Sequence, residues 1–203
     1  MSETAPIPQE MPVMVLPGTI LFPHAMLPLY IFEDRYRKML ADTLAANRMF
    51  AIGMPDPNQP GEDIPPIGCA GLIRACVSNP DGTSHLVLQG VFRVRFATWL
   101  QMHPYRIAKL LPFKTANANT PEVASLAREI RTLARKLGGK EKKIPEPLLE
   151  QIAQTDDPEV LCDLLSPALL FDSRLRQALL SEADLRARLE TIVQALHHLQ
   201  DGE

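Results

Sequence analysis

Hydrophobic and polar residues follow two different periods in the two halves of the chain. Residues 11 to 113 contain short apolar runs bounded by proline, glycine, asparagine and aspartate, which is typical of strands. Beyond residue 114 the apolar residues recur every three or four positions, as on one face of a helix. The pattern therefore predicts an α+β protein with two domains, a β subdomain over residues 11–115 and an α-helical subdomain over residues 116–203.

The segment VLPGTILFPHAMLPLYIFEDRYRKML, residues 15 to 40, is rich in proline for a stretch so hydrophobic. A proline ring removes a backbone donor and fixes φ, so these prolines argue against a helix interior and against an ordinary central strand. We expect two short strands, over residues 13–16 and 26–32, joined by a shaped loop. Gly18 would allow a tight turn in that loop.

Two longer runs downstream indicate an antiparallel hairpin. They cover residues 67–78 and 84–100, and the intervening NPDG has the composition of a turn. In the second run Arg93 and Arg95 alternate with apolar residues, which predicts a sheet with these two side chains on its solvent face. Gly90 marks a predicted bulge.

One helix and one more strand complete the predicted β half. A helix should begin near residue 33, because acidic residues open it and its apolar residues share one face. The residues of this face are Tyr36, Met39, Leu40 and Leu44. Residues 105–113 form the further predicted strand.

Capping residues divide the α-helical half into separate helices. Thr120 with the following proline predicts a helix start, and the glycines after residue 137 predict its end. The next helix would begin at Pro145 or Pro147, and the one after it at Pro158 with Asp156 or Asp157 as its cap. For the last helix, Ser181 followed three residues later by an aspartate predicts an N-cap.

Composition narrows the class of protein. The 203 residues carry a net charge of −3, which gives no electrostatic reason for a nucleic-acid partner. No apolar run approaches the roughly 18 residues of a membrane span, and the first residues lack the pattern of a signal peptide. We therefore expect a cytoplasmic protein without a membrane segment.

Motifs of catalysis and metal binding are absent from the sequence. There is no GxSxG, HExxH or P-loop pattern, the three cysteines show no CxxC spacing, and the five histidines are scattered. Buried thiols are the favoured interpretation of the cysteines. We expect no catalytic residue, no metal site, no cofactor and no enzymatic activity.

The opening segment resembles the signature of the Lon protease N-terminal domain, in which a strand, an LFP turn, an LPL strand and an IFE.RYR.ML helix follow in this order. The later PDGTSHLVLQGVFRVRF resembles that family's hairpin, with Gly90 and Arg93 at its G..R element. DDPEVLCDLLSPALLFDSRLRQALLSEADLRARLE is similar to its helical part. The resemblance extends from about residue 12 to residue 199.

This resemblance implies an N-terminal PUA-like β pseudobarrel with one crossing helix, followed by a C-terminal α-helical bundle. It implies a free-standing substrate-binding domain, without the ATPase and protease domains, that recognises unfolded or apolar polypeptide segments as an adaptor or chaperone-like protein. A separate protease or chaperone would then be a further partner, and the oligomeric state stays open. The candidate polypeptide-binding residues are Phe22, Met26, Leu27 and Tyr30. The alternative is an RNA-binding protein that uses the β subdomain, since PUA-like folds also occur in RNA-binding proteins.

Overall fold

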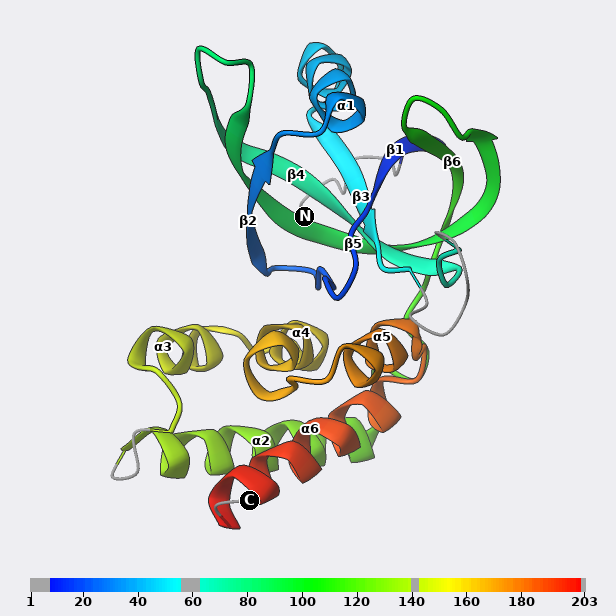
Figure 1. Ribbon diagram of the computed structural model, residues 1–203. Coiled ribbons are helices and arrows are strands. Elements are labelled where there is room, and N and C mark those ends of the chain that lie inside the picture. The colour runs from blue at the N-terminus through cyan, green and yellow to red at the C-terminus, as the bar shows by residue number, and fades with distance from the viewer. Residues whose placement is uncertain (1–7, 56–62, 140–142, 202–203) are drawn as a thin grey trace. The chain divides into compact units, whose positions relative to one another are not determined.

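The computed structural model describes residues 8–55, 63–139 and 143–201, and the chain divides into two compact units, Met1–Phe113 and Lys114–Glu203 (Figure 1). The predicted boundary after residue 115 lies close to this division. No helix in the described parts of the chain is both long and apolar enough to cross a membrane. The predicted loop over residues 53–68 falls partly outside the description, because residues 56–62 are not part of it.

The first unit contains six strands and one helix among its described residues, in the order β1 (Glu10–Val15), β2 (Met26–Ile31), α1 (Asp34–Ala45), β3 (Met49–Gly53), β4 (Ile67–Ser78), β5 (Ser84–Gln101) and β6 (Arg106–Pro112). The predicted hairpin is confirmed as β4 and β5, and the predicted helix as α1. The pattern missed β3, because four of its five residues are buried and no alternation marks it.

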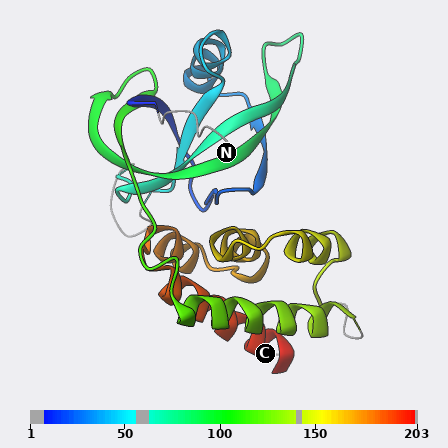
Figure 2. The same cartoon turned by 180° about the vertical axis from the view of Figure 1, so that it is seen from behind.

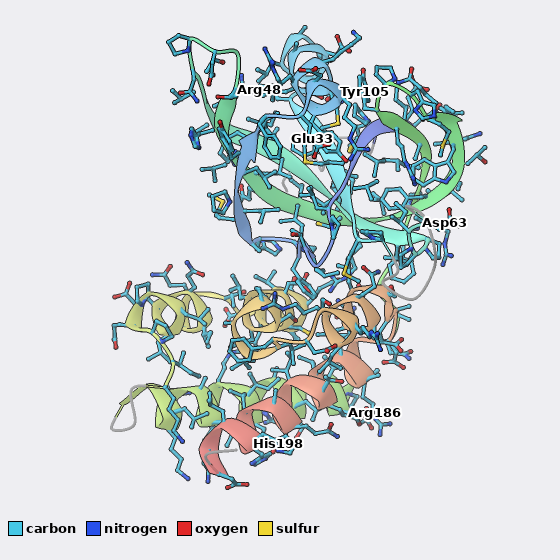
Figure 3. All side chains as sticks on the ribbon, in the orientation of Figure 1. Glu33, Arg48, Asp63, Tyr105, Arg186 and His198 are labelled. Carbon is cyan, nitrogen blue, oxygen red and sulfur yellow. The ribbon has the colours of Figure 1, made fainter. Side chains whose placement is uncertain are left out.

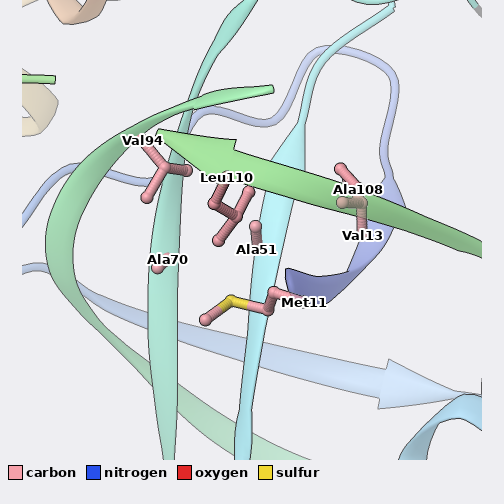
Figure 4. Packing of buried hydrophobic residues seen from close by; sticks show 7 residues of the cluster. All are labelled: Met11, Val13, Ala51, Ala70, Val94, Ala108 and Leu110. Atoms are coloured by element: carbon pink, nitrogen blue, oxygen red, sulfur yellow. The ribbon is translucent and has the colours of Figure 1, made fainter. Parts of the chain in front are cut away.

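Five of the strands close into a ring. β1 pairs with β3 in parallel, and the antiparallel pairs β3–β4, β4–β5, β5–β6 and β6–β1 complete the circuit. Buried side chains from all five strands meet inside the ring (Figure 4). They are Met11, Val13, Ala51, Ala70, Val94, Ala108 and Leu110. β2 lies outside this circuit and pairs only with β5 among the described strands.

The long strand β5 changes neighbours halfway along. Its first half, from Ser84 to Gln89, pairs with β2, and its second half, from Val94 onward, pairs with β6. The predicted bulge lies between these halves, since the register with β4 skips Val91 directly after Gly90. The bulge lets one strand belong to two differently curved parts of the sheet.

Gly90 also gives room to the proline-shaped loop before β2. His24 N donates to Gly90 O at 2.9 Å, and Gly90 N donates to Ala25 O at 2.9 Å. A Cβ atom on Gly90 would lie only 2.0 Å from Phe22 O. The loop backbone therefore crosses β5 at the one point where no side chain intervenes.

Two tyrosines fix α1 to the strands. The buried Tyr36 hydroxyl donates to Val15 O at 3.0 Å and accepts from Val15 N at 3.2 Å. Tyr105, which Figure 3 shows next to α1, donates to Asp42 Oδ2 at 2.7 Å. Burial and this hydrogen bond to a carboxylate raise the pKa of Tyr105 to about 12. The tyrosine is therefore a neutral donor to Asp42 at physiological pH.

The prediction for Arg93 was wrong. Its side chain is buried, whereas Arg95 is exposed as expected. Alternation places both arginines on one face of β5, and it cannot show that this face is covered at Arg93 and open at Arg95.

The regular elements in the described residues of the second unit are helices. They are α2 (Pro121–Gly139), α3 (Glu146–Gln154), α4 (Pro158–Leu169), α5 (Ser173–Ser181) and α6 (Leu185–Asp201) (Figure 2). Thr120 and Asp157 cap α2 and α4 as predicted, each through a side-chain oxygen that accepts a backbone N–H. The predicted cap at Ser181 was wrong, because Ser181 ends α5. Asp184 caps α6 instead, where its Oδ1 accepts from Arg186 N at 2.9 Å.

A fully buried arginine lies at the centre of this helical unit. Arg188 Nη2 on α6 donates to Thr115 Oγ1 at 2.8 Å and to Glu159 Oε1 at 3.2 Å. Its Nη1 lies 3.7 Å from Oδ1 of the equally buried Asp163 on α4. The group joins the segment before α2 to α4 and α6 through one desolvated charge. A helical pattern cannot reveal such a position, because arginine normally counts as a surface residue.

The close approach at Gly90 predicts a clear stability difference. Gly90→Ala should lower the free energy of unfolding of the first unit by roughly 1–3 kcal/mol, because the backbone of Phe22 has to move. The neighbouring Val91→Ala, at a partly exposed position, should change it by about 0.5 kcal/mol or less. Urea unfolding followed by the fluorescence of the single tryptophan, Trp99, measures both variants. Equal stability of the two variants would contradict the crossing described above.

The buried arginine predicts a second difference, within one helix. Arg188→Met should destabilise the helical unit by roughly 3 kcal/mol, because it leaves the buried Asp163 without its counter-charge. Arg186→Met is the matched control: it removes an exposed ion pair with Glu190, and exposed pairs contribute little. Urea unfolding followed by far-ultraviolet circular dichroism compares them. A loss as small for Arg188→Met as for Arg186→Met would show that the charge is dispensable.

Candidate functional site

Strands β2, β5 and β4 present a largely apolar outer face in the first unit. The strand register arranges this face in three rows, each with one residue from each strand. The rows are Met26, Gln89 and Leu72, then Pro28, Val87 and Ala75, then Tyr30, His85 and Val77. We call this set of nine residues the platform. Its members are alternate residues of β2 and β5 and their partners on β4, and their side chains point to the solvent side of the sheet. Few of these side chains are charged, although the solvent side of a sheet is usually polar.

Several platform side chains are strongly exposed. Met26 keeps 58% of its surface accessible, Tyr30 keeps 49% and Val77 keeps 66%. Exposed apolar side chains are ordinary when isolated, but these three share one face of three consecutive strands of the sheet. The platform is therefore a candidate contact surface for an apolar ligand.

An aromatic stack runs along one margin of the platform. The ring of Tyr30 lies 4.7 Å from that of His85 and 5.7 Å from that of Phe32, measured between centroids, and both pairs are stacked. The stack fixes large side chains in defined orientations before any ligand arrives. Ordered rings can bury an apolar ligand with little further loss of side-chain entropy.

The platform is hollowed over the row of Pro28 and the row of Tyr30. A cavity of about 420 Å³ is lined there by residues of all three strands, among them Pro28, Tyr30, Ala75, Val77, His85 and Val87. This volume lies within the range of sites that hold small molecules or side chains of a partner. The lining consists mainly of aliphatic and aromatic atoms, so shape and apolar contact rather than charge would select the ligand.

Polar groups lie at the margins of the platform. Arg74 Nε donates to Gln89 Oε1 at 2.5 Å, so the one amide of the platform is already engaged. In the turn between β4 and β5, Asp81 Oδ1 accepts from the hydroxyl and the backbone N–H of Thr83. These hydrogen bonds to the charged form lower the pKa of Asp81. These polar groups thus stabilise the hairpin, and the platform is apolar apart from Gln89, His85 and the Tyr30 hydroxyl.

The four residues predicted to bind polypeptide fall into two groups. Met26 and Tyr30 belong to the platform. Phe22 belongs to the loop before β2 and is fully buried, so it cannot contact a ligand in this conformation, and it is corrected to a core residue. Leu27 is half-buried on the opposite face of β2. The proline-rich pattern did not reveal which apolar residues face inward, because the loop that holds Phe22 has no period.

Sequence reasoning missed the platform residues contributed by the hairpin. Val77 stands two residues before the predicted NPDG turn and His85 three residues after it, so the sequence alone would pair Val77 with Ser84 instead. That β2 pairs with the first half of β5 could not be read from it, because strands this far apart carry no local signal. The platform depends on this long-range pairing.

Metal and cofactor sites are not indicated within the residues that the structure describes. No group of three or more His, Cys, Asp or Glu side chains is placed there to hold a metal ion. Cys69 and Cys162 are buried as expected, whereas Cys76 is half-buried at the platform. His198 lies exposed on α6, as Figure 3 shows.

A second hollow, of about 500 Å³, occurs within the helical unit. It is lined by residues that follow α4 and by residues of α6, and it lies beside Phe171, which keeps 84% of its surface accessible. No strand borders it. Phe171 is thus an exposed aromatic residue of the other unit that is not among the nine platform residues, and it can serve as a control position.

Comparison with known proteins gives consistent results. The family model of the ATP-dependent protease La (LON) substrate-binding domain matches residues 10–198. A Lon protease of Dictyoglomus thermophilum is 27% identical over 95% of this chain, and Lon protease 1 of Herpetosiphon aurantiacus is 28% identical over 98%. The chain spans about a quarter of the length of these relatives, 25% and 26%.

Solved structures share the fold. The N-terminal domain of a Mycobacterium avium complex Lon protease matches with a TM-score of 0.74 and 19% identity, over 93% of this chain and 98% of that one. A Lon N-terminal domain protein from Xanthomonas campestris matches with a TM-score of 0.66 and 21% identity, over 91% and 97%. The sequence resemblance noted above is thus confirmed.

Proposed function

Because this chain belongs to the LON substrate-binding domain family, we propose that it is a polypeptide-recognition module whose platform binds unfolded or apolar segments of other proteins. The single observation that carries the proposal is the exposed apolar surface shared by β2, β5 and β4. In a folded partner most large apolar side chains are buried, so a surface of this kind selects chains whose core has become accessible.

The proposed mechanism is non-covalent binding with no reaction step. Apolar side chains of the partner would move from water onto the platform and fill the hollow between Tyr30 and Val77. The favourable free energy of this transfer grows with the apolar area that is buried. No hydrogen bond joins Cys76 to His85, the two side chains of the hollow that could serve as nucleophile and base, and we propose a non-enzymatic role as an adaptor or chaperone-like protein. The part of the relatives that this chain matches is their substrate-binding part.

Two further elements belong to the same proposal. The closed ring of five strands with α1 packed on it supports assigning the first unit to the PUA-like pseudobarrels. A separate protease or chaperone would be the partner that receives the bound chain. RNA binding has no support among the relatives. None of the nine platform residues is lysine or arginine, and the neighbouring Arg74 is hydrogen-bonded to Gln89, so the platform is poorly suited to phosphate contacts.

Charged substitutions on the platform test the proposal. Met26→Asp and Val77→Asp should each weaken binding of a fluorescein-labelled, carboxymethylated and therefore unfolded model protein roughly tenfold, because a carboxylate would be desolvated in the complex. Both side chains are exposed, so folding should be unaffected. Fluorescence anisotropy measures the affinity, and circular dichroism checks the fold.

Phe171→Asp provides the matched control, because it introduces the same charge at an exposed apolar residue of the other unit. Its affinity for the unfolded protein should equal that of the unchanged chain. If all three variants bind equally well, the platform is not the binding surface. A labelled RNA oligomer in the same assay should give no saturable signal.

A further inference from the structure

Strand β2 has a free edge. It stands at one end of the strand order, and the described part of the chain pairs it with β5 alone. Figures 1 and 2 show it at the outer margin of the first unit from both sides. An edge of this kind presents unpaired backbone donors and acceptors, and such an edge can accept another strand.

The register shows which backbone groups face outward. Gly90 N donates to Ala25 O, so the backbone of Ala25 is turned toward β5. Backbone direction alternates along an antiparallel strand, and the register from Met26 to Ile31 is unbroken. Leu27 and Leu29 are therefore turned toward β5, and Met26, Pro28 and Tyr30 point their backbone groups to the free edge.

Proline occupies the middle of the three outward positions. Its missing N–H costs no hydrogen bond to β5, which explains why a proline is tolerated within β2. The free edge thus offers carbonyls at Met26, Pro28 and Tyr30, but N–H donors only at Met26 and Tyr30. It is an edge biased toward accepting hydrogen bonds.

From this geometry we propose that the bound polypeptide adds to the free edge of β2 as an extended strand, by main-chain hydrogen bonds. This inference rests on the proposed function and specifies the conformation and the class of its ligand. An added strand would place alternate side chains beside the platform, next to Met26 and Tyr30. Its other side chains would lie beside the half-buried Leu27 and Leu29 on the opposite face.

Both faces of the added strand would therefore have apolar neighbours. The ligand class that fits is a short segment that is apolar at consecutive positions, rather than one that alternates apolar and polar residues. In folded proteins such runs are typical of strands buried on both faces. The edge would thus recognise interior strands, which become accessible only when their protein unfolds.

N-methylated peptides test the main-chain contacts. The probe is a fluorescein-labelled peptide with a central run of valine, leucine, isoleucine, valine and phenylalanine between lysines. One derivative carries two N-methyl groups at positions i and i+2, which block one edge of the peptide and leave the other intact. The matched derivative carries them at i and i+1, which blocks both edges with the same number of methyl groups.

The first derivative should bind within about twofold of the unmodified peptide, and the second should bind at least about tenfold more weakly, because the peptide loses main-chain bonds on either edge. Equal affinity of the two derivatives would overturn the edge-pairing inference, while binding of the unmodified peptide would leave the proposed function in place. Failure of the unmodified peptide to bind would overturn both.

A protein variant provides an independent measurement. Pro28→Ala supplies the missing donor and should tighten binding of the unmodified peptide roughly two- to tenfold, the range expected for one added hydrogen bond. Pro112→Ala at the end of β6 is the control and should leave the affinity unchanged. Unchanged affinity in Pro28→Ala, with the fold intact by circular dichroism, would count against pairing at this edge.

Discussion

The architecture of the first unit depends on β5 serving two partners in succession. A strand can pair on only two sides, and one side of β5 is occupied by β4 along most of its length. Its other side is divided between β2 and β6, with the bulge after Gly90 at the change. Because β6 takes the second half and closes the ring through β1, β2 is left outside the closed circuit. The ring and the free edge are therefore consequences of the same strand.

This arrangement separates stability from recognition within one sheet. The side chains inside the ring are fully or almost fully buried and come from five strands, so they hold the unit together whether or not a ligand is present. The platform side chains are not members of that buried cluster, although six of the nine belong to the ring strands β4 and β5. Those that are apolar can stay exposed, because the fold does not depend on covering them. A recognition surface built this way is available without local unfolding.

Much of the fold could be predicted from sequence, because local signals are strong where turns and caps are involved. The NPDG turn, the Gly90 bulge, the helix of Tyr36 and Met39, and the start of α2 at Thr120 were all predicted and are confirmed.

The failures share one physical cause, which is burial determined by distant parts of the chain. Arg93 and Arg188 are buried although their residue type predicts exposure, and β3 is covered on both sides and shows no alternation. The candidate site was half predicted for the same reason: Met26 and Tyr30 lie in a regular strand, whereas the position of Phe22 depends on how an aperiodic loop crosses β5.

Pro28 also limits how two copies of this protein can meet. An exposed, apolar edge strand is the usual starting point for edge-to-edge pairing between identical molecules, and such pairing can continue into aggregates. If two β2 edges approach each other, each brings a gap where a donor should be, so a continuous ladder of hydrogen bonds cannot form between them. A short ligand strand needs only a few of these bonds, so the missing donor weakens it less than it weakens a ladder between two whole β2 strands. The proline thus allows an apolar edge to stay open in a crowded solution without becoming a template for self-association.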